Sequence, residues 1–345
     1  MEKKKVVIAL SGGVDSAACA IIAKEMGHEI IGATLILKDS DVNNTVNQEI
    51  LKELSTKLNF PHHYIDCREK FLNKVIKPCA ETYFRGQTPN PCCLCNPVLK
   101  FKELLAFTQE VGADELWTGH YAQIENGKLY KGVDLRRDQS YFLYRLPEDY
   151  LKKIHFPLGP YTSKDEIRAL LKDYNFPFHN RPDSQDVCFG VPGVTCGETL
   201  RILANLPEKP GHFSYNGKIV GHHKGIHIYT IGQREGLGVA LGVPAYISKI
   251  DASRRRIELT TNSNDLMSTS FIVSDLVFTA NQKVEDCKVK IRYRSSEVEC
   301  KIIYHDNYIE VFPKTPLRAV TCGQSAVFYL DNQVIFGGII KEAKK

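Results

Sequence analysis

The first 36 residues follow one clear pattern of apolar runs and a glycine-rich turn. Residues 6–10 form a short apolar run, which predicts a buried strand. Residues 11–13, Ser-Gly-Gly, interrupt that run, and apolar side chains then recur at helical spacing over residues 16–26. Residues 30–36 predict a second strand. This order is typical of a strand–loop–helix–strand unit in a parallel α/β sheet.

The pattern changes twice further along the chain. Predicted strands and helices alternate up to residue 196, and short strands with turn residues follow a predicted helix at 197–206. Beyond residue 268, alternating runs separated by Asn, Asp and Gly predict antiparallel strands of a small barrel or sandwich. We therefore expect an α/β fold with three domains, at 1–196, 197–268 and 269–345.

Composition indicates the cellular compartment and the state of the cysteines. No apolar stretch approaches the ~20 residues that span a bilayer, and no signal peptide is recognisable, so we expect no membrane partner and a cytoplasmic protein. In that compartment the 11 cysteines are expected to be thiols. They are then candidates for catalysis, metal binding or core packing.

Charge is distributed unevenly. Residues 1–200 carry a net charge of −1 and residues 201–345 a net charge of +6. A basic module beside a neutral one favours a polyanionic partner such as RNA, although a solvated basic surface has the same composition.

The glycine-rich turn is the first candidate site. A loop that ends at a helix start presents backbone N–H groups to one point, which favours a phosphate. The string fits neither GxxxxGK[ST] nor GxGxxG. Asp15 would repel a phosphate unless a cation intervened, which predicts Mg²⁺ on a polyphosphate. A tight turn without a ligand is the alternative reading.

Two segments contain cysteine thiols that are candidates for catalysis or metal binding. "TPNPCCLCNPVLKF", at 88–101, has the prolines and asparagines of an exposed loop and contains Cys92, Cys93 and Cys95. Cys188 lies in a second polar segment, "RPDSQDVCF". A structural zinc site would need a second close pair of cysteines, which the chain does not offer. Thiolate nucleophiles are the alternative.

Taken together, the motifs resemble one family. "ALSGGVDS" is similar to the PP-loop of ATP pyrophosphatases. With "TPNPCCLCNPVLKF", "TGHYA", "RDQSYFLYRL", "TSKDEIR", "RPDSQDVCF", "YTIGQREGLGV", "KIRYRS" and "CGQSAVFY", the chain resembles bacterial tRNA-specific 2-thiouridylases nearly from end to end. The resemblance implies a catalytic α/β PP-loop domain, a small central domain and a C-terminal antiparallel β-barrel. It also implies that ATP adenylates the C2 oxygen of the wobble uridine and that sulfur replaces this oxygen, giving 2-thiouridine, AMP and pyrophosphate.

The resemblance also implies roles for individual residues. Cys95 and Cys188 match the two catalytic cysteines, of which Cys188 bears a persulfide, and Asp15 lies nearest Mg²⁺. Gly119 would contact ATP, and Leu35 takes the place of a methionine beside the adenine. The residues around the ATP phosphates would be Ala9, Leu10, Ser11, Gly12, Gly13, Val14, Asp15 and Ser16.

Further matches concern the RNA. The segment Asn90, Pro91 and Cys92 would receive the flipped-out base. The other implied tRNA contacts are His120, Arg137, Asp138, Gln139, Arg292, Tyr293 and Gln324.

Cys92 departs from the family pattern, which usually has Asp there. Cys92, Cys95 and Cys188 could be three ligands of a [4Fe–4S] cluster whose open iron carries sulfide. In the other mechanism a sulfur-relay protein or cysteine desulfurase supplies the persulfide on Cys188, and Cys95 forms a transient disulfide with it. Two other classes stay open: a PP-loop ligase that adenylates a small acid, and a non-catalytic tRNA-binding protein.

Overall fold

The computed structural model describes residues 2–182, 187–280 and 283–344. Contacts divide the chain into two compact units. Of the described residues, the first unit contains 2–71, 93–182 and 332–335, and the second contains 72–92, 187–280, 283–331 and 336–344.

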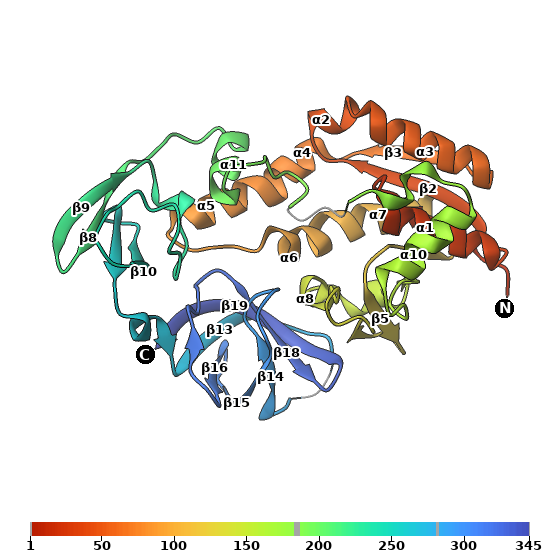
Figure 1. The fold of residues 1–345 in the computed structure, drawn as a ribbon. Helices are drawn as coiled ribbons and strands as arrows, with labels where there is room; N and C mark the ends of the chain where they lie inside the picture. The colour runs from red at the N-terminus through yellow and green to blue at the C-terminus, as the bar shows by residue number, and fades with distance from the viewer. Residues whose placement is uncertain (1, 183–186, 281–282, 345) are drawn as a thin grey trace. The chain divides into compact units, whose positions relative to one another are not determined.

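A five-stranded parallel sheet is the centre of the first unit (Figure 1). Its strand order is β3-β2-β1-β4-β7. The strands are β1 (Lys5–Ala9), β2 (Glu29–Ile36), β3 (His62–Asp66), β4 (Glu115–Trp117) and β7 (Ile154–His155). The other elements are α1 (Val14–Glu25), α2 (Asp39–Val42), α3 (Thr45–Leu58), α4 (Arg68–Phe71), η2 (Asn96–Lys100), α7 (Phe101–Glu110), β5 (Ala122–Glu125), β6 (Lys128–Lys131), α8 (Ser140–Leu143), α9 (Glu148–Leu151), α10 (Lys164–Asp173) and η3 (Pro177–Asn180).

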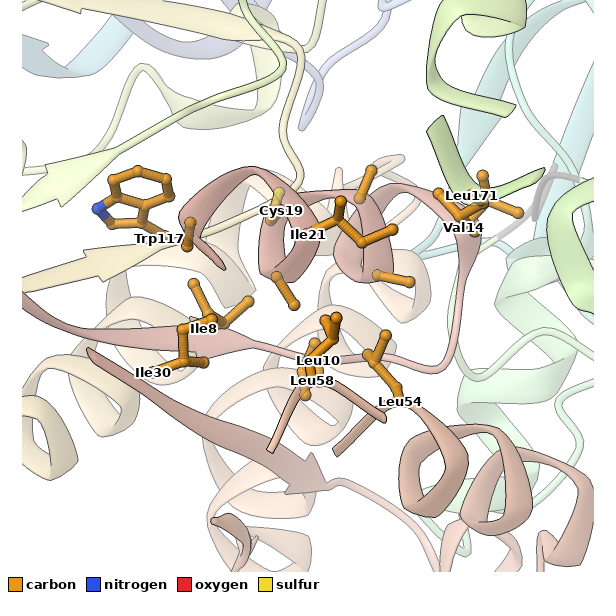
Figure 2. Packing of buried hydrophobic residues seen from close by; sticks show 14 of the residues in the cluster. Ile8, Leu10, Val14, Cys19, Ile21, Ile30, Leu54, Leu58, Trp117 and Leu171 are labelled. Carbon is orange, nitrogen blue, oxygen red and sulfur yellow. The ribbon is translucent and has the colours of Figure 1, made fainter. Parts of the chain in front are cut away.

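The core of this unit forms where the predicted pattern placed it. The apolar run ends one residue earlier than expected and the helix begins two residues earlier, at β1 and α1. α1 packs on β1 and β2, and α3 and α10 pack on α1 within the same cluster of buried side chains, while α7 contacts β1 and β4. Figure 2 shows side chains of this cluster, among them Ile8, Val14, Ile21, Leu54 and Leu171. Burial of such side chains is worth roughly 1.5–3 kcal/mol each.

The cysteine-rich segment is helical where the sequence predicted a loop. The loop prediction for residues 91–100 is wrong: α6 (Pro91–Cys95) leads into η2, a π-helical turn, and then into α7. The Asn90 side chain accepts a hydrogen bond from Cys92 N at 3.1 Å, and proline is favoured in a first helical turn. The residues that suggested a loop therefore act as helix-start signals.

The second unit combines a small sheet with a barrel. Before them come η1 (Leu72–Ile76), α5 (Lys77–Phe84) and α11 (Cys196–Leu203). The small sheet has the order β10-β11-β8-β9, formed by β8 (Gly211–Tyr215), β9 (Lys218–His223), β10 (Tyr246–Asp251) and β11 (Arg256–Thr260). Two 3₁₀ turns, η4 (Ile226–Ile228) and η5 (Ser263–Leu266), follow β9 and β11.

The barrel confirms the expectation of C-terminal antiparallel strands. Hydrogen-bonded neighbours run β13-β16-β15-β14-β18-β19, and β13 also pairs with β19, which closes the sheet and removes its edges. The strands are β13 (Ser270–Phe278), β14 (Asp286–Lys290), β15 (Val298–Tyr304), β16 (Tyr308–Pro313), β18 (Ser325–Leu330) and β19 (Gln333–Lys344), and a short pair joins β12 (Met267–Ser268) to β17 (Leu317–Arg318). No helix in the described part of the chain is long and apolar enough to cross a bilayer.

Five histidines have a lowered pKa, and His155 is the most exposed of them. Burial lowers the pKa of His62 to about 4, of His120 to about 3 and of His223 to about 4, and it also lowers the pKa of His155 and His227. In the unfolded chain each would titrate near 6.5. The unfolded state therefore binds protons first as the pH falls, so stability is full above about pH 6.5 and decreases below it.

We expect the urea midpoint of unfolding to decrease as the pH is lowered from 7 to 5. Over this range each fully buried histidine should reduce the free energy of unfolding by roughly 1–2 kcal/mol. His223 lies edge-on to the Phe213 and Tyr229 rings, so His223→Phe should reduce this pH dependence. The matched control is His222→Phe, at the exposed neighbouring position. An identical pH dependence in both variants and the wild type would contradict the assignment.

Candidate active site

The predicted nucleotide loop lies where the strand order of the first unit reverses. β1 pairs with β2 on one side and β4 on the other, and both pairings are parallel. Residues 11–13 follow β1, and residues 118–120 follow β4. Ligands of open α/β sheets bind at the carboxyl ends of strands at such a reversal.

The loop is preorganised by its own hydroxyl groups. Ser16 Oγ donates to the Gly13 carbonyl at 3.0 Å and accepts from Ser11 N at 3.2 Å. α1 starts at Val14 without a side-chain cap, so its first backbone N–H groups remain for a ligand. This geometry fits a phosphate held by backbone donors.

Asp15, in the first turn of α1, carries two side-chain hydrogen bonds. Its Oδ1 accepts from the Tyr121 hydroxyl at 2.6 Å and from Lys164 Nζ. Only 4% of the Lys164 side chain is exposed. Burial of an ammonium group is costly unless a carboxylate compensates it, and Asp15 provides that charge.

Asp15 also fits the implied magnesium ion. Both donors bind Oδ1, and within the described residues no protein donor binds Oδ2. A carboxylate oxygen is a ligand that Mg²⁺ prefers. When bound with a polyphosphate, Mg²⁺ would neutralise part of its charge.

Gly119 lies directly against the same residue. A Cβ built on Gly119 would be 3.0 Å from the carbonyl carbon of Asp15 and 3.1 Å from its oxygen. Only glycine allows this approach of the segment after β4 to α1. The predicted ATP residues Asp15 and Gly119 are therefore neighbours, whereas Leu35 is half-buried on the adjacent strand β2.

Tyr121 joins the nucleotide loop to the predicted RNA-binding segment 137–139. Its backbone carbonyl accepts from Gln139 N at 2.8 Å, and its N–H donates to Gln139 Oε1 at 3.1 Å. The Arg137 guanidinium lies 6.0 Å from the centre of the Tyr121 ring. Asp138 is buried and accepts from Gly132 N at 3.1 Å, so its carboxylate shapes this segment.

A second cation borders the loop. Arg181 Nη1 donates to the Gly12 carbonyl at 3.0 Å and to Asn47 Oδ1 at 2.8 Å. Arg181 opens the segment that leads to Cys188, of which residues 183–186 lie outside the described residues. The Arg181 guanidinium thus links the nucleotide loop to Asn47 of α3.

His120 lies beside the loop as a neutral imidazole. Its Nδ1 is 2.7 Å from Thr118 Oγ1, and its ring lies near the rings of Phe101 and Phe156. Burial, with the charge of Lys100 as a second cause, lowers its pKa to about 3. The imidazole is therefore uncharged at neutral pH.

The cysteines differ in exposure. Cys93 is 1% exposed and its thiol points to the Tyr141 carbonyl at 3.5 Å, while Cys95 is 4% exposed. Cys92 is half-buried, and Cys188 is exposed. Among the described residues, no three His, Cys, Asp or Glu side chains are arranged to hold a metal ion.

In the second unit, the segment before Cys92 docks on the turn after β17. Thr88 N donates to the Cys322 carbonyl at 2.9 Å, and Thr88 Oγ1 lies 3.2 Å from Thr230 Oγ1. Gly323 has φ +90°, and a Cβ there would be 3.0 Å from Gln87 Cβ. Glycine is thus required where this segment contacts the barrel.

Two predicted tRNA residues meet at the same turn. Arg292 Nη2 donates to Thr321 Oγ1 at 2.8 Å, and Gln324 N donates to the Thr321 carbonyl at 3.2 Å. Tyr293 lies 5.5 Å from Lys290 Nζ. Asn90 belongs to the segment that docks on this turn, so the second unit brings three of the predicted RNA contacts into one region.

Sequence reasoning missed Lys164, Tyr121 and Arg181. A usable signal existed for Lys164, because it follows Ser163 in a capping box with Glu166. A cation in the first turn opposes the helix dipole, and such a breach of a local rule marks functional positions. Tyr121 and Arg181 lie in quoted motifs but carry no comparable signal.

We expect Asp15→Ala to lower the free energy of unfolding by about 2–3 kcal/mol, because it removes the carboxylate that Lys164 Nζ binds at the start of α1. The estimate lies below that for fully buried pairs because a third of the Asp15 side chain is exposed. In the double variant Asp15→Ala/Lys164→Met, most of the lost free energy of unfolding should be recovered, as measured by urea denaturation. Additive losses in the double variant would show that the pair is not coupled.

Comparisons with known proteins cover the whole chain. Residues 4–191 match the tRNA methyl transferase HUP domain, 201–259 the tRNA methyl transferase PRC-barrel domain, and 268–340 the aminomethyltransferase beta-barrel domain. Two solved structures are weakly similar: a 4-thiouridine synthetase–RNA complex with bound ATP and an NMN synthetase from Francisella tularensis. Their TM-scores are 0.35 and 0.33, at 20% and 18% identity; each match covers 59% of this chain, and 50% and 84% of those chains.

Curated relatives are much more similar. The tRNA-specific 2-thiouridylase MnmA of Acetivibrio thermocellus is 38% identical over 99% of this chain and 100% of its own length. The MnmA proteins of Clostridium botulinum and Carboxydothermus hydrogenoformans are 37% and 36% identical over 99% of this chain and 99% and 98% of their own lengths. With three family domains in order and this identity along its length, the chain belongs to the MnmA family of tRNA-specific 2-thiouridylases.

Proposed function

We propose that this protein is an ATP-dependent tRNA-uridine 2-sulfurtransferase that converts the wobble uridine, position 34, of tRNA to 2-thiouridine. The observation that carries the proposal is its end-to-end match to 2-thiouridylases, in a chain whose nucleotide loop has the geometry of a phosphate site. Its substrates are tRNA, ATP and a sulfur donor, with Mg²⁺ accompanying ATP.

The first half-reaction uses the groups around Asp15. The C2 oxygen of the uridine attacks the α-phosphorus of ATP, the bond to the β-phosphate breaks, and pyrophosphate leaves. The backbone N–H groups at the start of α1 bind the phosphates, and the buried charge of Lys164 holds Asp15 at the loop. Arg181 Nη1 donates to the Gly12 carbonyl, so this oxygen is bound by a cation beside the phosphate site.

The second half-reaction uses the two cysteines. The terminal sulfur of a persulfide on Cys188 attacks C2, the bond from C2 to the adenylated oxygen breaks, and AMP leaves. The Cys95 thiolate then attacks the Cys188 sulfur, so the 2-thiouridine is released and a Cys95–Cys188 disulfide forms. A thiol reductant must regenerate both thiols.

Pyrophosphate release tests the proposed function. We expect wild-type protein to release pyrophosphate from ATP only with unmodified tRNA that has uridine at the wobble position, and tRNA with cytidine there is the control. Release without tRNA would instead indicate a ligase for a small acid. Binding of tRNA without release would indicate a non-catalytic binder.

The sulfur route has a separate test in anaerobically purified protein. We expect an iron-free enzyme to form 2-thiouridine from a persulfide donor, with Cys92→Ala within about threefold of wild type. The rate of 2-thiouridine formation should fall at least about 100-fold in Cys95→Ser and in Cys188→Ser. The matched control is Cys93→Ser, at the buried site facing Tyr141. Stoichiometric iron and sulfide, lost together with activity in Cys92→Ala, would contradict this route and indicate a cluster.

A further inference from the structure

The segment 230–239, "TIGQREGLGV", has no role in the chemistry above, yet it forms one wall of a hollow in the second unit. The hollow has a volume of about 510 Å³ and is lined by Gly232, Gln233, Arg234, Glu235, Tyr246 and Arg318. We call it the arginine hollow.

The first wall is a braced turn. Gly232 N donates to the Ile247 carbonyl at 2.8 Å, and Ile247 N donates to the Gln233 carbonyl at 3.0 Å. The Gln233 side chain accepts from Thr230 N at 3.1 Å and donates to the Glu235 carbonyl at 2.9 Å. The Gln233 amide therefore fixes the turn, and the next side chain, Arg234, projects from it.

The second wall comes from β17 and the residue after it. The Arg318 guanidinium lies 5.1 Å from the centre of the Tyr246 ring. Gly232 has φ +83°, and a Cβ there would be 2.6 Å from Ala319 Cβ. The two walls thus meet at a glycine that no other residue could replace without displacement.

The hollow carries a surplus of positive charge. Two arginines face one glutamate, and both arginines are exposed. Across the described residues, neither Arg234 nor Arg318 forms an ion pair with a carboxylate. An arginine fork without a protein partner suits a phosphate, which it can bind through two parallel hydrogen bonds.

The hollow is connected to the predicted RNA contacts. Arg292 binds the backbone carbonyl of Ala319, the residue that touches Gly232, and also Thr321. Thr230, at the start of the braced turn, contacts Thr88 of the segment before Cys92. The same backbone segments that form the hollow therefore also position Arg292 and the predicted base-receiving segment.

We propose that the arginine hollow binds a backbone phosphate of the tRNA, at a nucleotide other than the wobble uridine. This inference rests on the proposed function. Arg318 and Arg234 hold the phosphate, and the Arg318 guanidinium and the Tyr246 ring each have a flat face on which an adjacent base can stack. Most RNA-positioning contacts go to phosphates in this way.

The test measures affinity for unmodified tRNA at 50–200 mM KCl. We expect Arg234→Gln and Arg318→Gln each to weaken binding about tenfold and to reduce the salt slope by about one. The matched control is Arg254→Gln, an exposed arginine after β10 that lies 4.0 Å from Asp251, and it should change affinity less than twofold. Arg318→Lys keeps the charge and should recover part of the loss.

Wild-type affinity and salt slope in the double variant Arg234→Gln/Arg318→Gln would overturn the inference. Normal tRNA affinity with impaired sulfur transfer from a protein donor would also overturn it, because the hollow would then dock that protein. Within the described residues the Arg234 side chain forms no ion pair or hydrogen bond, so its substitution separates binding from folding. A wild-type protein that neither binds tRNA nor releases pyrophosphate with it would instead refute the proposed function.

Discussion

The buried contact between Lys164 and Asp15 is the interaction on which the first unit depends. It places an ammonium group at the start of α10, where the helix dipole disfavours a cation, and compensates it with a carboxylate from the start of α1. The Tyr121 hydroxyl binds the same oxygen. Three segments that are far apart in sequence therefore converge on one carboxylate. The nucleotide loop, the segment after β4 and the "TSKDEIR" helix keep their relative positions as a result.

This convergence explains how signals could pass within the unit. Tyr121 binds Asp15 through its hydroxyl and Gln139 through its backbone. Arg181 binds the Gly12 carbonyl and belongs to the segment that precedes Cys188. Polyphosphate at the loop would compete with Asp15 for the charge of Lys164, or bring Mg²⁺ to Asp15. Either change would alter the surroundings of the Tyr121 hydroxyl, because it and Lys164 Nζ bind the same oxygen.

Local patterns predicted local structure well. The loop between β1 and α1 and the barrel strands at 308–313 and 325–330 could be read from apolar spacing and turn residues. The segment 91–100 was misread because Asn and Pro occur both in loops and at helix starts, and only the apolar residues that follow distinguish the two. Lys164 and Tyr121 were out of reach for another reason: their contacts with Asp15 span 149 and 106 residues. Such pairings depend on topology, which spacing alone does not determine.

The π-helical turn η2 determines which way the cysteines face. Phe101 N donates to the Asn96 carbonyl, five residues back, so this turn contains one residue more than an α-helical turn. Each residue of an α-helix advances the side-chain direction by about 100°. Removing the extra residue would therefore rotate Cys95 by about that angle relative to Phe101 and Leu104 of α7, which are anchored in the core. The directions in which the side chains of α6 point are therefore set by the irregular hydrogen bonding of η2. Deleting one residue at 96–100 would redirect the thiols although every cysteine stays in the sequence.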